Sequence, residues 1–232
     1  MDCYFTETDD TYEYHVEAVP PGYKDILGHF FFTEAGDGYQ KIYPKDTLMF
    51  PHDSSILNRN FQEGLPRMIR QFLDVESMKW ETVLEETIQI LDRYEINWWL
   101  AGSAACSVRG INISPHDLDI MTYRSEIGKF EKAFTDTTFE PFHRVTDWIV
   151  KGFGVVFLGG RVDFAFEPED SSDQYGRQDC GVYASNHLEE IQWNGHSIRA
   201  PPIELHIQAN VGRNRTERVK LIESYIEQNR HP

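Results

Sequence analysis

Cysteine is scarce in this chain. The three cysteines of the 232 residues, Cys3, Cys106 and Cys180, are odd in number and widely spaced. Such spacing forms neither a disulfide framework nor a zinc-binding pattern, and it fits a reducing compartment. Cys106 lies among small residues and is expected to fill space in the core, because no histidine partner that would activate its thiol can be named.

Positive charge is also in short supply. Lysine and arginine number 22 against 38 aspartates and glutamates, so the formal net charge is −16. Sequence-independent affinity for nucleic acid comes mainly from Lys and Arg side chains that meet phosphates, so a nucleic-acid partner is not expected. The charge favours a small or cationic ligand, because an acidic cleft concentrates cations. A strongly hydrated acidic surface is the simpler explanation of the same charge.

Long apolar runs are missing as well. No stretch has the length of a membrane-spanning helix, and the first residues, MDCYFTETDD, are acidic where a signal peptide would be basic and then apolar. We therefore expect no membrane partner and a cytoplasmic location.

Residues 1–60 differ in pattern from the rest. Strand-like runs cover 12–19, 29–33 and 39–43, with a turn at 34–38. This pattern predicts a β-rich N-terminal extension that either covers the main sheet or binds a partner.

Residues 61–232 alternate between helical and strand patterns. Apolar residues recur at helical spacing before residue 95, and a terminal helix is expected over about 216–228. An acidic loop is expected at 167–173, and Asn194-Gly195 is a favoured turn for a short hairpin. The predicted fold class is α/β (α+β), with a mixed β-sheet flanked by helices.

The most informative stretch runs from Trp98 to Tyr123. An apolar strand ends at Gly102-Ser103, a helix of small residues should follow, and a second strand carries Asp117-Leu118-Asp119. Side chains alternate along a strand, so Asp117 and Asp119 share one face, about 7 Å apart. Two such carboxylates suit a hard cation such as Mg²⁺. Gly102 lets a ligand approach the backbone, and Ser103 can offer its hydroxyl to a phosphate.

In this order the residues resemble the polymerase-beta-like nucleotidyltransferase superfamily. Its signature is Gly-Ser, a short helical spacer, and two acidic residues separated by one apolar residue. The spacer here, 104–116, is long for that family, and His116 stands where related enzymes often have arginine. The segment 201–205, Pro-Pro-Ile-Glu-Leu, and the arginine-rich turn 212–218 resemble the C-terminal part of aminoglycoside and lincosamide nucleotidyltransferase-like proteins.

The resemblance implies a third carboxylate from a later strand. Residues 153–158 and 161–167 read as two arms of a hairpin around Gly159-Gly160. Asp163 lies on the face opposite the apolar side chains of the second arm, and it is the first choice if this strand pairs beside the Asp-x-Asp strand. Asp147 and Glu167 are the competitors.

The resemblance also implies the chemistry. Asp117, Asp119 and Asp163 would hold two Mg²⁺ ions that clamp a nucleoside triphosphate, and Asp163 is placed to act as general base. Arg213 and Arg215 either hold the triphosphate by bidentate contacts or pair with surplus acids. His116 and the later His206 are expected to pack or to support the site rather than to bind a ligand.

These observations predict an enzyme that moves a nucleoside monophosphate from a triphosphate to a hydroxyl of a small molecule or protein. One alternative is a toxin- or antitoxin-type nucleotidyltransferase that acts on RNA or protein. Another is a non-catalytic relic of the fold that binds a nucleotide or a partner. The sequence names neither the nucleotide nor the acceptor.

Overall fold

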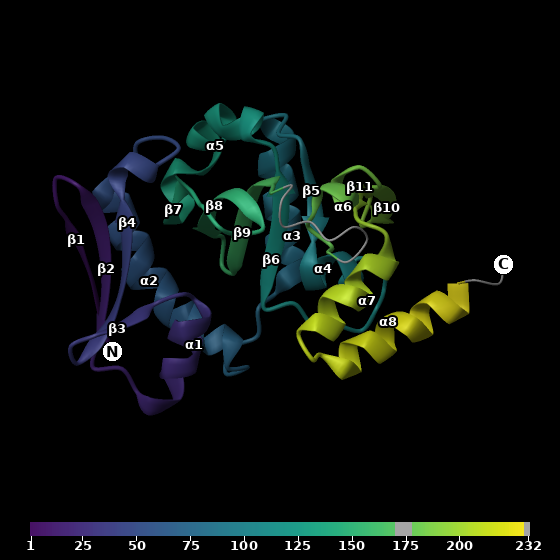
Figure 1. Cartoon of the computed structure of the whole chain (residues 1–232), viewed down its shortest axis with the longest axis horizontal. Coiled ribbons are helices and arrows are strands. Elements are labelled where there is room, and N and C mark those ends of the chain that lie inside the picture. The colour runs from purple at the N-terminus through teal and green to yellow at the C-terminus, as the bar shows by residue number, and fades with distance from the viewer. Residues whose placement is uncertain (170–177, 230–232) are drawn as a thin grey trace.

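A five-stranded mixed sheet forms the centre of the protein (Figure 1), as seen in a computed structural model that describes residues 1–169 and 178–229. The strand order is β5-β6-β9-β8-β7. Only the β6–β9 pair is parallel. The strands are β5 (Trp98–Ala101), β6 (Asp117–Thr122), β7 (Thr138–Arg144), β8 (Val150–Phe157) and β9 (Arg161–Pro168). The predicted mixed sheet and the β8–β9 hairpin are confirmed.

One face of this sheet is covered by α3 (Trp80–Arg93) and α5 (Ile127–Phe134). Leu84 and Ile88 of α3 pack in one cluster with Ile120 of β6 and Phe164 of β9. The helical spacing predicted for 61–95 thus builds the apolar face of α3, while a second helix, α2 (Ser54–Phe72), precedes it. Asp53 caps the start of α2, because its carboxylate accepts from the backbone N–H groups of the first turn.

The other face is partly covered by the N-terminal extension. Its four strands pair in the order β1-β2-β4-β3. Tyr14 of the extension, Phe61 of α2 and Val155 of β8 belong to one buried cluster. Of the two roles foreseen for this region, covering the main sheet is confirmed. The strands are β1 (Asp2–Glu7), β2 (Thr11–Glu17), β3 (Thr33–Ala35) and β4 (Gly38–Pro44).

Two details of the extension differ from expectation. The run 29–33 is not a strand: helix α1 (Lys24–His29) ends there, and the aromatic residues that follow turn inward or into the cavity before β3 begins. Buried contacts of Phe30 outweigh its strand propensity. The turn is also shorter than predicted, since Ala35 already pairs with Gly38. The boundary foreseen between 1–60 and 61–232 falls inside α2, and the division into domains stays a prediction.

The C-terminal part lies beside β5, the strand at one edge of the central sheet (Figure 1). It consists of the short helix α6 (Val182–Ser185), the predicted hairpin of β10 (Glu189–Trp193) and β11 (His196–Ala200), and helices α7 (Ile203–Gly212) and α8 (Thr216–Asn229). The short helix α4 (Gly102–Ser107) lies earlier in the chain, between β5 and β6. The hairpin turns at Asn194-Gly195, both with positive φ. Of the acidic loop foreseen at 167–173, residues 170–173 lie outside the described residues. No helix in the described part of the chain is long and apolar enough to cross a membrane.

Candidate functional site

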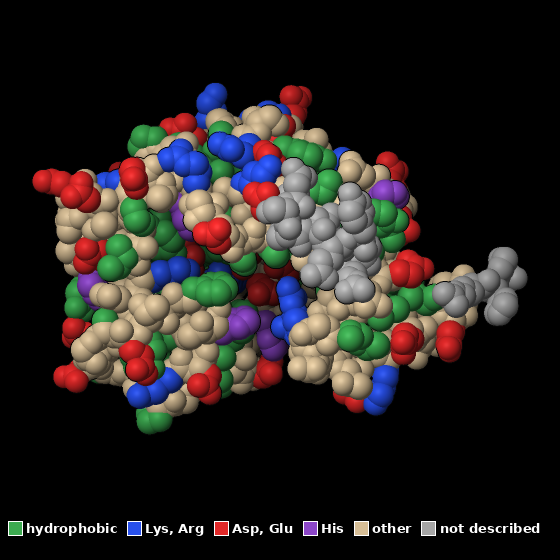
Figure 2. All heavy atoms as spheres, viewed as in Figure 1, with side chains coloured by type: hydrophobic (Ala, Val, Ile, Leu, Met, Phe, Trp, Pro, Cys, Tyr) green, Lys and Arg blue, Asp and Glu red, His purple; other side chains and the backbone are tan. Residues whose placement is uncertain are grey.

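A cavity of about 570 Å³ opens between the central sheet, the N-terminal extension and the α7–α8 turn. Figure 2 shows it as a hollow with acidic side chains at its floor and basic side chains and histidines at its rim. Its volume is in the range of small-molecule sites. The cavity contains every site residue predicted from the sequence: Gly102, Ser103, Asp117, Asp119, Asp163, Arg213 and Arg215.

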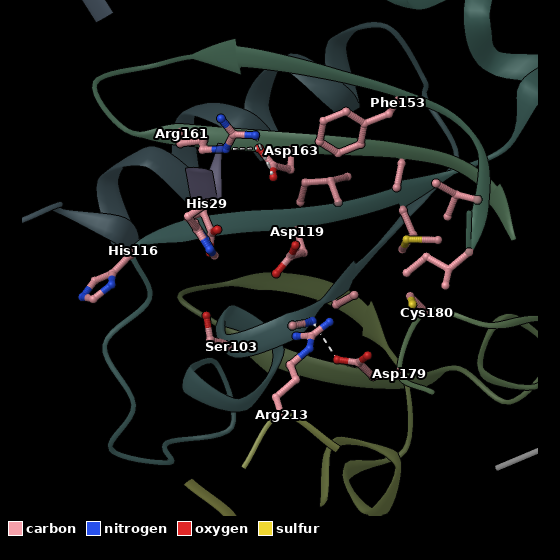
Figure 3. Close-up of a pocket in the computed structure, with 18 of the residues that line it drawn as sticks. His29, Ser103, His116, Asp119, Phe153, Arg161, Asp163, Asp179, Cys180 and Arg213 are labelled. Atoms are coloured by element: carbon pink, nitrogen blue, oxygen red, sulfur yellow. Dashed lines mark hydrogen bonds and ion pairs between the residues drawn. The ribbon is translucent and has the colours of Figure 1, made fainter. Parts of the chain in front are cut away.

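The three predicted carboxylates come together because of strand register. Asp117 and Asp119 alternate with the buried Leu118 along β6. In the parallel pairing of β6 with β9, Asp119 lies opposite Asp163. The carboxylates therefore reach the same cavity from neighbouring strands, as Figure 3 shows for Asp119 and Asp163.

These carboxylates are crowded. Burial raises the pKa of Asp119 well above its usual range, and the charges of Asp117, Asp163 and Asp179 raise it further. Burial also raises the pKa of Asp163, to about 7, although Arg161 opposes the shift. Burial and mutual repulsion thus disfavour the ionised forms of these carboxyl groups, and a bound cation would favour them.

The Gly102 turn presses against the acids. Gly102 has a φ of +61°, and a Cβ built on it would overlap the Asp119 carboxylate. Its N–H donates to Asp179 Oδ2 at 3.2 Å, so this amide already has a partner. Ser103, the next residue, lines the cavity beside it (Figure 3). The sequence predicted a close approach of ligand and backbone here, and the closest neighbour of Gly102 is a carboxylate.

Asp179 is a cavity residue that sequence reasoning missed. It is 6% exposed, and Oδ2 lies 3.1 Å from Nδ1 of the fully buried His206 in α7. Burial disfavours a charged imidazole, but Asp179 and Cys106 outweigh that effect and raise the pKa of His206 to about 10. His206 is therefore a buried partner of Asp179, and its charge lowers the pKa of Asp179 against the effect of burial.

The histidine near Cys106 could not be named from the sequence. Cys106 contacts His206, one hundred positions along the chain in α7. Cys106 is 1% exposed and packs among isoleucines of α7 and α8, so its expected role as a core residue is confirmed. A thiol so enclosed cannot reach a substrate in the cavity.

Arg213 and Arg215 line the cavity with Arg218. Partial burial lowers the pKa of Arg215, and the nearby charges of Arg218 and Arg213 lower it further. Among the described residues, neither Arg213 nor Arg215 forms an ion pair. Three crowded guanidinium groups at the rim are suited to an anion such as a phosphate.

The competitors for the third acid do not line the cavity. Glu167 pairs with Lys151 at 2.8 Å, and Asp147 lies in the turn between β7 and β8. His116 is at the cavity rim, where Nε2 lies 3.1 Å from Asp74 Oδ1 and the ring packs on Phe72. His116 thus lies where a ligand could reach it, and its expected supporting role stays a prediction.

The donors suit magnesium in kind. Asp117 and Asp119 offer only oxygen, the ligand that Mg²⁺ prefers, and a bound triphosphate would supply more. Within residues 1–169 and 178–229, no three His, Cys, Asp and Glu side chains are grouped to hold a metal by themselves. Both oxygens of Asp163 face Arg161, at 2.6 Å from Nε and 3.3 Å from Nη2. Asp117 and Asp119 would therefore be the main protein ligands.

Comparison with known proteins gives structural matches only. No protein-family model and no curated sequence matches the chain. Among solved structures, it is similar to a proposed nucleotidyltransferase from Thermotoga maritima, with 18% identity and a TM-score of 0.47, over 65% of this chain and 94% of that one.

Two antibiotic-modifying enzymes are also similar. The lincosamide adenylyltransferase LnuA, solved with lincomycin, has 14% identity and a TM-score of 0.46 over 62% of this chain and 97% of its own. ANT(2″)-Ia, solved with adenylyl-2″-tobramycin, has 12% identity and a TM-score of 0.41 over 62% and 88%.

Proposed function

We propose that the protein is a Mg²⁺-dependent nucleotidyltransferase. It moves a nucleoside monophosphate from a nucleoside triphosphate to a hydroxyl group of a small molecule or a protein. The observation that carries this proposal is the register of two parallel strands, which places Asp119 opposite Asp163 in a cavity with the Gly-Ser turn and free arginines.

The basic and the acidic residues of the cavity have different roles in the proposed reaction. Arg213, Arg215 and Ser103 lie on the side where the β- and γ-phosphates would bind. Asp117 and Asp119 would face the α-phosphate, and Asp163 would face the acceptor. The acceptor oxygen forms a bond to the α-phosphorus, the bond between that phosphorus and the β-bridging oxygen breaks, and pyrophosphate leaves. Asp163 takes the hydroxyl proton.

Magnesium would be held by Asp117 and Asp119, with Asp163 as the third predicted ligand. When bound, it would neutralise charge on the phosphates and on the leaving group. The raised pKa of Asp119 supports this assignment, because a carboxyl group that burial and like charges disfavour gains most from a cation.

One observation favours a second candidate function. Both oxygens of Asp163 face Arg161, so this acid is already neutralised by the protein. A protein that bound the triphosphate on Asp117, Asp119 and the arginines without transferring it would tolerate such an arrangement.

The proposal is tested by measuring the transfer of radioactive label from a nucleoside triphosphate to an acceptor. The protein is incubated with each α-labelled nucleoside triphosphate, Mg²⁺, a panel of aminoglycosides and lincosamides, and a cell extract. We expect one class of acceptor to gain label and pyrophosphate to be released in equal amount. Asp119→Asn should abolish the transfer, whereas Asp92→Asn, an exposed aspartate of α3, should leave it intact.

Calorimetry with a triphosphate and Mg²⁺ separates the two candidates. Triphosphate binding that depends on Asp119, with no labelled acceptor, would favour the non-catalytic function. Binding that persists in Asp117→Asn and in Asp119→Asn would rule out the acidic site for both.

A further inference from the structure

Four charged side chains form a buried chain from the N-terminal extension to the catalytic sheet. Lys41 on β4 places Nζ 2.7 Å from Glu140 Oε2. Glu140 Oε1 lies 3.3 Å from Nη1 of Arg161, whose Nε lies 2.6 Å from Asp163 Oδ1. The chain thus ends on the acid that the proposed function assigns to the acceptor hydroxyl, as Figure 3 shows for its last pair.

The chain is largely enclosed. The side chains of Lys41, Glu140, Arg161 and Asp163 are 13%, 1%, 3% and 16% exposed, so the two central members are buried and the two ends are partly so. Its atoms come from three distant segments, and the pairing of β7 with β8 is irregular on both sides of Glu140. Such irregularities change the direction of a side chain, and here the Glu140 carboxylate is directed into the protein.

Charge balance explains why each member is needed. Two cations, Lys41 and Arg161, face two anions, Glu140 and Asp163. Burial opposes ionisation of Glu140, but Lys41 and Arg161 outweigh it and lower its pKa to about 2. A buried charge that loses its partner is strongly destabilising, so removal of one member forces the others to rearrange.

Arg161 is shared between the two acids. Its Nε and Nη2 face Asp163, and its Nη1 faces Glu140. Oε2 of Glu140 is occupied by Lys41 and by the hydroxyl of Tyr43 at 2.6 Å. Without Lys41, Glu140 would keep its charge with one cation fewer and would draw Arg161 away from Asp163.

We propose that Lys41 is a positioning residue for Asp163, acting through Glu140 and Arg161. The inference rests on the proposed function, and it makes the N-terminal extension a part of the catalytic machinery rather than a separate appendage. Lys41 does not line the cavity, and its effect is to fix the orientation of the acid that receives the acceptor proton.

The test is a double-mutant cycle of Lys41→Met and Asp163→Asn in the full chain, read by two methods. Urea unfolding needs no acceptor. If the two residues are coupled, the fold-change that the double variant causes in the unfolding equilibrium constant should differ about tenfold from the product of the fold-changes of the single variants. In label transfer, Lys41→Met should lower kcat about tenfold at unchanged KM for the triphosphate, and it should have no further effect in the Asp163→Asn background.

Lys45→Met is the matched control. Lys45 directly follows β4 and pairs with Glu7 at 2.7 Å on the surface, so its loss removes a similar ion pair away from the chain. The fold-changes that Lys45→Met and Asp163→Asn cause in the unfolding equilibrium constant should multiply in the double variant. Lys45→Met alone should leave kcat unchanged. If Lys41→Met does not fold, Tyr43→Phe removes one hydrogen bond from Glu140 and leaves all four charges in place.

The outcomes separate the inference from the proposed function. Independent effects of Lys41 and Asp163 on unfolding would overturn the inference, whether or not the protein is a transferase. A tenfold loss of kcat that persists without the Asp163 carboxylate would also overturn it. Coupled unfolding in a protein that labels no acceptor would support the buried chain and count against the proposed function.

Discussion

Gly102 is the residue at which the site leaves least room. Its φ is positive, and any Cβ would overlap the carboxylate of Asp119. We therefore expect Gly102→Ala to displace Asp119 and to weaken Mg²⁺-dependent triphosphate binding by about a hundredfold, measured by calorimetry, which corresponds to roughly 3 kcal/mol.

Gly110→Ala separates backbone strain from this clash. Gly110 also has a positive φ, of +86°, but its Cβ would meet nothing within 4 Å. It should lose about 1 kcal/mol of stability and keep its triphosphate affinity. Equal affinity losses in the two variants would show that strain alone explains the effect of Gly102→Ala.

His52 gives the protein a weakness to acid. Burial lowers the pKa of His52 to about 4, while its Nε2 accepts from the N–H of Phe142 on β7. The pKa of His52 in the folded protein lies below the unfolded value of 6.5, so between pH 4 and pH 6.5 the unfolded chain binds the proton more tightly than the folded protein does. Stability contributed by neutral His52 is present above pH 6.5 and is lost as the pH falls towards 4.

Urea unfolding at several pH values checks this prediction. When the pH is lowered from 7 to 4.5, the free energy of unfolding of the parent should fall by about 2 kcal/mol more than that of His52→Gln, because glutamine does not titrate. His187→Gln, at an exposed histidine of another segment, is the control and should lose as much as the parent. Parallel curves for the parent and His52→Gln would contradict the prediction.

At the scale of elements, one buried ion pair ties helix α7 to the Gly-Ser turn. Asp179 accepts from the N–H of Gly102 and lies 3.1 Å from His206 of α7. Asp179→Asn would leave the buried imidazolium without its counter-charge. We expect a loss of about 3 kcal/mol of stability at pH 7, measured by urea unfolding, and weaker triphosphate binding in the folded fraction.

The pH dependence of this pair has the opposite direction to that of His52. The pKa of His206 is raised to about 10, so its contribution is fully present below pH 6.5 and is lost as the pH rises through 10. The difference in stability between the parent and Asp179→Asn should therefore shrink from pH 7 to pH 10. A difference that stays constant over this range would show that the pair is not ionic.

At the scale of the whole molecule, the extension and the central sheet share a core. The cluster that contains Tyr14 and Val16 of β2 also contains Phe139 and Val155 of the central sheet, joined by residues of α2. Separate unfolding would expose both sides of this cluster to water. We therefore expect a single cooperative transition despite the difference in sequence pattern.

Two probes test this cooperativity. All five tryptophans lie between residues 80 and 193, and Trp148 alone of them is in ring contact with the extension, at Phe31. In a Trp148→Phe background, tryptophan fluorescence therefore follows the main part. Hydrogen exchange in urea, resolved by peptide, follows β1 to β4. The two free energies of opening should agree. A lower value for the extension would instead support a domain boundary near residue 60.

The sequence determined the features that depend on neighbours along the chain. Alternation placed Asp117 and Asp119 on one face of a strand, and the same rule put Asp163 on the face opposite Phe164. Apolar spacing predicted α3, and turn residues predicted the β8–β9 and β10–β11 hairpins. These patterns have periods of a few residues, so they can be read without knowing the rest of the fold.

Only the tertiary structure decided which distant side chains meet. Lys41 and Glu140 are 99 positions apart, and Gly102 and Asp179 are 77 apart. Neither Asp179 nor Glu140 stands in a periodic pattern that marks it in the sequence. The parallel pairing of β6 with β9 brought Asp163 to Asp119. The sequence patterns did not predict this pairing, and the choice of Asp163 assumed it. Local patterns fix the face on which a side chain lies, but its partner depends on how faces pack, because burial selects among many arrangements with the same local structure.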